Sequence, residues 1–484
     1  MSSANPRRWW ALAVIALAQF MVIMDTSIIG VALPEIQLDL GFDQNSLSWV
    51  FNAYVIAFGG LLLLGGKLSD VWGAKRLFTA GWLILAAGSV VAGLAETQWL
   101  EITGRAIQGV GAAAIAPSAL TLLIMLFGSE PKELTKALAI YGAAAPAGGT
   151  AGVFLGGVLT DVASWEWVFF INLPIAAIAL AATPALMPDA PGQRGRIDLA
   201  GAFTATAGLA AAVFAIVRAP EEGWGSAVTI GVLAGAVALL ALFVAIQRSR
   251  REPLMPLGIF RTHNLRSTNL SIMLLGAAWI PMWFFLNLYL QQVLNLEPFA
   301  AGAALLPMTA LIMVLMSTVA APVINRFGFR LPIVAGLSIL AVGLGWLAFV
   351  PADGSYAANV LPASLVAATG MALAYIPSLQ GAISSVRPEE GGLASGIVNT
   401  SYQVGSAVGL AAVTAVAASQ GAEQLGNEVA LTNGFQAAFI VAAGIAALGG
   451  VVAALLVGPP QGPEPEPAPE QPEAPAGEPA LSGN

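Results

Sequence analysis

Fourteen runs of about 20 or more mostly apolar residues follow one another along this chain of 484 residues. A helix needs about 20 such residues to cross the hydrocarbon core of a bilayer. The runs are too long for membrane strands and lack a two-residue alternation. We therefore expect an all-α integral membrane protein with fourteen transmembrane helices, at 9–33, 46–65, 76–95, 98–127, 136–160, 166–187, 198–217, 225–247, 267–293, 299–322, 331–350, 357–385, 391–418 and 434–457.

The composition excludes several classes of protein. Hydrophobic residues make up 57% of the chain and charged residues only 10%, whereas a soluble domain has about 25% charged residues. The chain has no Cys and a single histidine, His263, and its net charge is −8. We expect no enzyme, no metal site, no cofactor and no nucleic-acid partner. No GxxxxGK[ST] motif is present, so any driving energy must come from an ion gradient or a separate partner.

The positive charges predict the orientation of the chain in the membrane. With fourteen crossings, 17 of the 19 Lys and Arg residues fall on one side. Of the other two, Arg218 falls on the opposite side and Arg105 lies inside a span. The positive-inside rule then places both termini in the cytoplasm. The Ala- and Gly-rich composition is typical of a bacterium with a GC-rich genome, so we expect a multi-pass protein of the bacterial plasma membrane.

The spans divide into six, two and six. We expect a six-helix bundle at 1–190, an inserted helix pair at 191–250 and a second bundle at 251–458, followed by a disordered Pro- and Glu-rich tail at 459–484. The loop GGKLSDVWGAKR at 65–76 and the loop INRFGFR at 324–330 occupy matching positions in the two bundles. This weak internal repeat is typical of secondary transporters.

Several segments carry a resemblance to a known family. They are MDTSIIGVALPEIQ at 24–37, the loop at 65–76, RAIQGVGAA at 105–113, the glycines of span 5 and WEWVFFINLPI at 165–175. Together they resemble the major facilitator superfamily, and the fourteen-helix layout is similar to its drug:proton antiporter-2 family. The resemblance implies two six-helix bundles plus an inserted pair, working by alternating access around a central site. Val71, Ala74 and Val153 depart from the family's loop and glycine patterns.

The resemblance assigns roles to two motifs. A cytoplasmic gating motif would consist of Gly66, Asp70, Gly73, Lys75 and Arg76, with Asp70 latching onto the start of span 13 at 388–392. The alternative is a tight turn with ordinary positive-inside charges. An antiporter glycine motif would consist of Gly148, Gly152, Gly156 and Gly157. Glycines at this spacing let helices approach closely, either as a sliding seam between the halves or as packing alone.

Asp25 and Arg105 are the predicted proton-coupling pair. We take Asp25 as the only acid, and Arg105 as the only cation, deep inside a span. Asp25 lies about 13 Å and Arg105 about 10 Å from the same membrane surface, at 1.5 Å per residue. We expect them to share a hydrated site in which Asp25 takes up and releases a proton. The alternative is a permanent structural ion pair that fixes the helix register.

By analogy with the superfamily, spans 1, 4, 9 and 12 line the substrate path. The cavity candidates are Gln19, Gln108, Trp283, Phe284, Asn287, Gln291, Tyr375 and Gln380. We expect a monomer that exchanges protons for small lipophilic or monocationic molecules and exports drugs or antibiotics. The alternatives are a dedicated exporter of one metabolite or self-made antibiotic, and a membrane sensor or scaffold without transport.

Overall fold

The computed structural model describes residues 7–128, 130–189, 198–250, 253–386 and 391–458, and the regular elements within these ranges are all helices. The α-helices are α1 (Arg7–Leu40), α2 (Gln44–Trp72), α3 (Ala74–Gly93), α4 (Gln98–Phe127), α5 (Pro131–Val162), α6 (Trp167–Phe170), α7 (Asn172–Leu186), α8 (Leu199–Glu222), α9 (Ala227–Ser249), α10 (His263–Leu288), α11 (Pro298–Thr318), α12 (Ala320–Phe327), α13 (Arg330–Leu347), α14 (Leu361–Ile383), α15 (Gly391–Ala417) and α16 (Glu428–Leu456). Short 3₁₀ or π segments are η1 (Leu257–Arg261), η2 (Tyr289–Val293), η3 (Tyr356–Val360) and η5 (Ala418–Ala422).

The described residues contain fourteen helical stretches long and apolar enough to cross a membrane, which confirms the predicted count. Their bounds lie within a few residues of most of the predicted ones, and the fourth, Gln98–Phe127, matches in full. The sixth stretch is split between α6 and α7. The predicted bounds of the tenth ran too far: α11 ends at Thr318 and the short helix α12 begins at Ala320.

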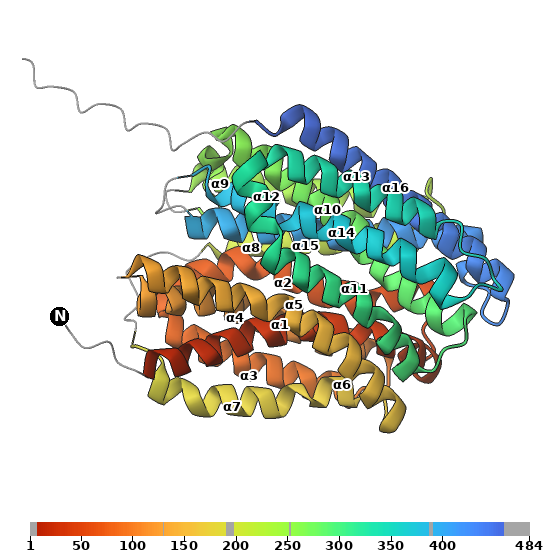
Figure 1. Cartoon of the computed structure of the whole chain (residues 1–484), viewed down its shortest axis with the longest axis horizontal. Coiled ribbons are helices and arrows are strands. Elements are labelled where there is room, and N and C mark those ends of the chain that lie inside the picture. The colour runs from red at the N-terminus through yellow and green to blue at the C-terminus, as the bar shows by residue number, and fades with distance from the viewer. Residues whose placement is uncertain (1–6, 129, 190–197, 251–252, 387–390, 459–484) are drawn as a thin grey trace, which may run out of the picture.

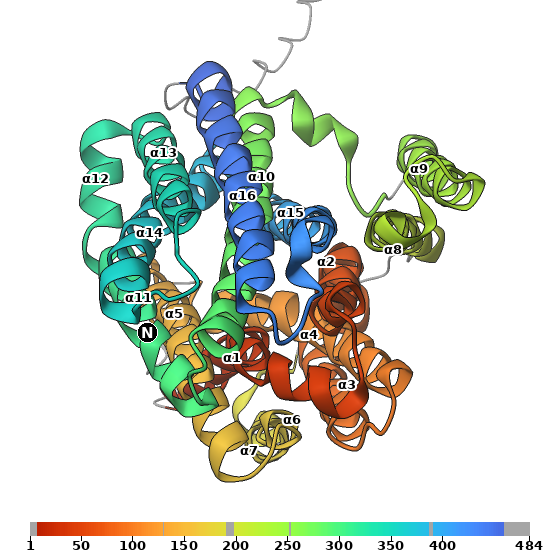
Figure 2. The same cartoon turned by 90° about the vertical axis from the view of Figure 1, so that its right-hand side faces the viewer.

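The long helices lie side by side and run roughly parallel or antiparallel (Figure 1). We call α1 to α7 the N-terminal half and α10 to α16 the C-terminal half. Contacts between the halves are made mainly where α2 packs on α15 and α5 packs on α11. Helices α8 and α9 pack on each other at the edge of the molecule, where α8 contacts α2 and α15 (Figure 2).

Equivalent glycines mark the internal repeat. Gly73 separates α2 from α3 with φ +97°, and Gly328 separates α12 from α13 with φ +70°. A left-handed backbone is strained for residues with a side chain, so both turns favour glycine. The helix pairs that follow also pack alike: a Cβ on Gly111 would lie 2.8 Å from the Gly81 carbonyl oxygen, and one on Gly370 would lie 2.6 Å from that of Gly336.

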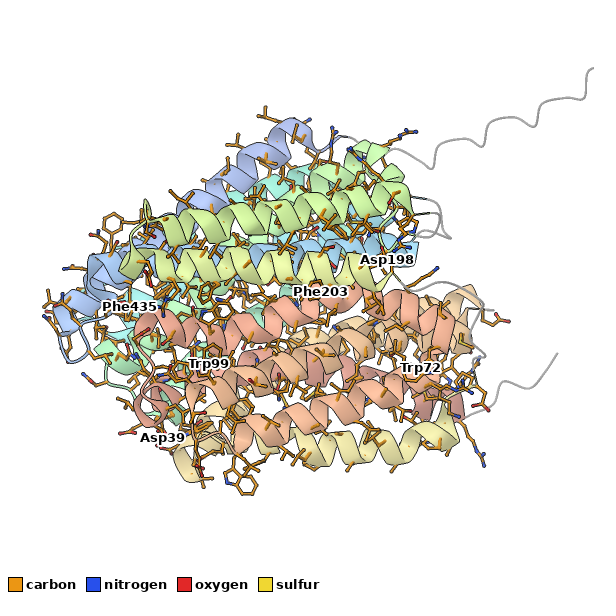
Figure 3. The ribbon with its side chains drawn as sticks, turned by 180° about the vertical axis from the view of Figure 1, so that it is seen from behind. Asp39, Trp72, Trp99, Asp198, Phe203 and Phe435 are labelled. Carbon is orange, nitrogen blue, oxygen red and sulfur yellow. The ribbon has the colours of Figure 1, made fainter. Side chains whose placement is uncertain are left out.

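The bundle has two ends that matter for function. Because the chain crosses fourteen times, α1 begins and α16 ends at the same end, which we call the termini face. Trp72 and Asp198 lie toward this face, whereas Asp39 and Trp99 lie toward the other end, which we call the opposite face (Figure 3). Most long helices are apolar on all sides, and large exposed side chains such as Phe203, at 69% exposure, suit contact with lipid.

Candidate functional site

Asp25 of α1 and Arg105 of α4 form a direct ion pair inside the N-terminal half. Arg105 Nη1 lies 2.8 Å from Asp25 Oδ2, and both side chains are 0% exposed. The depth comparison from the sequence therefore placed the two groups correctly. The pair is closed off from bulk solvent, in contrast to the hydrated setting that we expected.

Three polar side chains complete the network around the Asp25 carboxylate. Asn172 Nδ2 donates to Asp25 Oδ1 at 2.6 Å, and Gln108 Nε2 donates to the same oxygen at 3.2 Å. Both amides also donate to Ser89 Oγ, which in turn donates to the Leu85 carbonyl. Burial of a carboxylate is costly unless it is paired and hydrogen-bonded, and this network supplies both kinds of partner.

The guanidinium of Arg105 is held by α2 and by two aromatic rings. Its Nε donates to the Val50 carbonyl oxygen at 2.9 Å, and Nη1 also donates to Gln108 Oε1 at 2.7 Å. The guanidinium carbon lies 4.5 Å from the Tyr54 ring centroid and 5.9 Å from that of Phe169. Cation–π contacts strengthen when the cation is desolvated, so the two rings add to the stabilisation of this buried guanidinium.

The local sequence explains why these side chains converge. Thr97 caps α4 by accepting a hydrogen bond from the Leu100 N–H, which fixes the helix start two turns before Arg105. Asn172 stands where the sixth span breaks between α6 and α7. Ser89 and Asn172 were not singled out from the sequence. Asn172 lies in the quoted segment 165–175, whereas nothing marks Ser89 until α3 is seen to pack on α4.

Glu101 corrects the expectation that Asp25 is the only acid deep in a span. It lies one turn before Arg105 on α4 and is 0% exposed. Within the described part of the chain, neither of its carboxylate oxygens has a hydrogen-bond partner. The sequence did not mark Glu101 as buried because it lies in the first turn of a helix, where acids are common at a solvated helix end.

The cavity candidates take several different places. Gln108 belongs to the Asp25 network, Trp283 packs on Gly30, and Phe284 packs edge-on against Phe285, at 5.1 Å between ring centroids. Asn287 donates to the Trp283 carbonyl and is 0% exposed, and Gln291 bonds to α1. Tyr375 packs edge-on against Tyr402, at 5.5 Å between ring centroids. Gln19 is half-buried and Gln380 is exposed.

The two halves meet closely toward the opposite face. Gln291 Nε2 donates to the Val31 carbonyl at 2.9 Å, and Gln292 Nε2 donates to Gln37 Oε1 at 2.8 Å. The Trp283 ring lies against Gly30, where a Cβ would overlap it. All these contacts join α1 to α10 or η2. They hold the halves together on the opposite-face side of Asp25.

The glycines of α5 serve two different contacts. A Cβ on Gly148 would overlap the Phe20 carbonyl oxygen, and a Cβ on Gly152 or Gly156 would lie 2.7 Å from a carbonyl oxygen of α1. These three glycines pack α5 on α1 within one half. Gly157 differs, because its Cβ would lie 2.7 Å from the Pro298 carbonyl oxygen of α11. A contact between the halves is therefore made at Gly157 alone of the four.

The loop after α2 links back to the end of α7. Lys75 Nζ lies 2.9 Å from Asp189 Oδ1 and also donates to the Pro184 carbonyl. This hydrogen bond and the nearby positive charge hold the pKa of the Asp189 carboxyl below its usual range. Gly66 has open space where a Cβ would lie, and Arg76 is exposed. The start of span 13 at 387–390 and the Asp70 side chain fall outside the described residues.

Several curated relatives of the chain are named as antibiotic exporters or resistance proteins. The chain is 36% identical over 467 residues to the puromycin resistance protein pur8 of Streptomyces alboniger, a match that covers 94% of this chain and 92% of that protein. It is 38% identical over 413 residues to the cephamycin export protein CmcT of Amycolatopsis lactamdurans, covering 84% and 85%.

The fold agrees with that of solved transporters. The nucleoside transporter NupG matches with a TM-score of 0.63 at 16% identity, over 92% of this chain and 99% of that one. A peptide transporter, PepTSo, matches with a TM-score of 0.65 at 18% identity, over 92% and 97%. Residues 15–410 match the model of the Major Facilitator Superfamily. With its fourteen spans in the arrangement of the drug:proton antiporter-2 type, the chain belongs to the major facilitator superfamily of membrane transporters.

Proposed function

We propose that this protein is a proton-coupled antiporter that exports antibiotics or other lipophilic or monocationic drugs by alternating access. The observation that carries the proposal is the buried pair of Asp25 and Arg105, with a 2.8 Å contact inside the N-terminal half. A carboxylate in the middle of a membrane costs about 2.5–3.5 kcal/mol on insertion scales and is a functional candidate by default. The names of the relatives support export as the direction of transport.

Asp25 is the proton carrier in this proposal. Protonation removes its charge and with it the attraction of Arg105, whose Nη1 then keeps only Gln108 as a partner. The Val50 carbonyl and the Tyr54 ring hold Arg105 in place, so the guanidinium is still in position when Asp25 ionises again. Release of the proton on the other side of the membrane restores the ion pair and resets the site.

The termini face is the cytoplasmic side in this proposal. The bias of Lys and Arg toward that side supports it. The contacts of Gln291, Gln292 and Trp283 with α1 then close the outer side. Asp70, near the end of α2, would latch the cytoplasmic side in the alternate state by bonding to the N-terminus of α15.

The substrate range has two candidates. Relatives named for multidrug resistance, such as Stp of Mycobacterium tuberculosis at 32% identity, favour a broad range. Relatives named for one antibiotic, such as puromycin, cephamycin or lincomycin, favour a dedicated exporter. Efflux assays on a panel of unrelated drugs and single antibiotics separate the two. We place the chain in the bacterial plasma membrane, as a monomer.

The decisive experiment is efflux from proteoliposomes with an imposed pH gradient. The wild type should move substrate against the substrate gradient, driven by the pH gradient. Asp25→Asn should lose this pH-driven transport while still exchanging substrate when the pH is equal on both sides. Asp353→Asn, which changes an exposed acid at the opposite face, is the matched control and should behave as the wild type does. An Asp25→Asn protein that still couples efflux to the pH gradient would contradict the proposal.

A further inference from the structure

Glu101 is a buried carboxylate that has no role in the transport cycle proposed above. It is 0% exposed and lies one helical turn from Arg105, on the same face of α4 and nearer the opposite face. Of the charged side chains that the structure describes, those buried are Asp25, Glu101, Arg105 and Asp198. Asp198 lies at the start of α8, toward the termini face, so the other three share the interior of the N-terminal half.

Two facing groups in this interior have spare hydrogen-bonding capacity. Neither Glu101 Oε1 nor Oε2 has a hydrogen-bond partner among the residues that the structure describes, and the same holds for Arg105 Nη2. Arg105 uses Nη1 and Nε for Asp25, Gln108 and Val50. Side chains at i and i+4 are neighbours on the surface of a helix, so the unpaired Nη2 belongs to the side chain next to Glu101 on α4.

The charges of the site balance only if one carboxyl is neutral. Asp25 already takes the single positive charge of Arg105, with two further donors on its oxygens. An ionised Glu101 would add a second negative charge without a donor, which a low-dielectric interior strongly disfavours. A protonated Glu101 is the form that balances these charges.

No other titratable group nearby changes this balance. The charged groups that act on Glu101 are Arg105 on its own helix and Asp25 on α1. The packed helix α2 contributes the Tyr54 ring, while Lys67 and Asp70 lie at its other end. The titratable groups of α3 are Lys75 and Arg76, at the termini face, and neither α6 nor α7 has any.

We propose that Glu101 is a second proton-binding carboxylate of this site, and that Arg105 pairs with whichever of Asp25 and Glu101 is ionised. This inference rests on the proposed antiport. The proton that Asp25 accepts is the one that Glu101 gives up, and Arg105 turns Nη2 toward the newly ionised Glu101. The three groups carry zero net charge before and after, so the proton moves without leaving an unpaired charge in the membrane.

Infrared difference spectroscopy tests directly whether Asp25 and Glu101 share the cation Arg105. It compares the wild type with variants of the purified full-length protein in lipid, near neutral pH. The wild type should show a protonated-carboxyl band that Glu101→Gln lacks. Asp25→Asn should lose the same band, because Arg105 is then free to hold Glu101 ionised. The control Glu96→Gln, an exposed acid just before α4, should keep it. A band that persists in Asp25→Asn, or no difference between wild type and Glu101→Gln, overturns the inference.

Transport gives the second readout. In Glu101→Gln, proton uptake by Asp25 leaves Arg105 without a carboxylate, so pH-driven efflux should fall at least about tenfold while exchange at equal pH remains. Unchanged pH-driven efflux overturns the inference. If the wild type shows no pH-driven efflux, the proposed function fails and the infrared comparison still decides the role of Glu101. If Glu101→Gln does not fold, the wild type and Asp25→Asn spectra decide alone.

Discussion

Gly30 offers the sharpest test of how the halves close. It lies on α1, one turn beyond Asp25, and the ring of Trp283 from the other half packs on it. In Gly30→Ala the new Cβ would overlap this ring, with Cη2 at 2.7 Å and Cε3 at 2.9 Å, whereas ordinary contacts begin near 3.4 Å. Trp283 is only 8% exposed, so its ring has little room to retreat.

The free-energy cost of Gly30→Ala in the closed state can be estimated from this overlap. A methyl group forced into a well-packed contact costs about 1–3 kcal/mol. The cost applies only while the halves are closed at the opposite face, because separation of α1 from α10 removes the contact. The ratio of open to closed molecules should therefore rise by about 5- to 150-fold.

Spin labels measure this shift without interference, because the chain has no native cysteine. Leu38→Cys on α1 and Leu425→Cys before α16 are exposed and belong to different halves. Gly30→Ala should lengthen the distance between the labels, and adding Trp283→Ala should restore it. Gly345→Ala is the control, because open space surrounds that position. An unchanged distance in Gly30→Ala, or no rescue by the second substitution, would refute the reasoning.

Three further predictions follow from single contacts. Gly157→Ala should slow transport with little loss of thermal stability, because its Cβ meets the backbone of α11 in the other half; an unchanged rate would contradict this. Asn172→Ala removes a 2.6 Å hydrogen bond to the Asp25 carboxylate, worth about 1.5–3 kcal/mol, so pH-driven efflux should fall by about tenfold or more; an unchanged efflux rate would count against Asp25 as the proton carrier. Lys75 lowers the pKa of Asp189, so their link stabilises the fold above the ordinary pKa of the acid and is lost as pH falls through the lowered value. Asp189→Asn should therefore lower the melting temperature slightly at neutral pH and not in strong acid, as measured by thermal unfolding at both pH values.

The sequence predicts the spans well because the bilayer imposes one length on every helix. The same rule explains why the depths of Asp25 and Arg105 can be compared from the sequence alone. A depth along the membrane normal follows from counting residues at 1.5 Å each. The ion pair at 2.8 Å also needs the two helices to face each other, and here the resemblance to a known family supplied the missing information.

The sequence does not show which way a side chain points around its helix when all sides are apolar. Gln108 and Gln291 were both candidates for the substrate path, yet one bonds inside the N-terminal half and the other bonds to the α1 backbone. The glycines of α5 show the same limit. Their spacing predicts close packing, but only the structure separates Gly157 from the three glycines that pack on α1.

Coupling needs one rigid element that contacts both the proton site and the gate. In the proposed cycle helix α1 is that element: it carries Asp25, and one to three turns further it carries Gly30, Val31 and Gln37, which contact the C-terminal half. The α5 glycines pack against α1 beside Asp25, so α1 cannot bend there without moving α5. In the proposed cycle, loss of the charge on Asp25 weakens the link between α1 and α4, and a shift of α1 then disturbs the contacts with Trp283 and Gln291. A proton bound wholly inside one half would in this way loosen the contacts between the two halves.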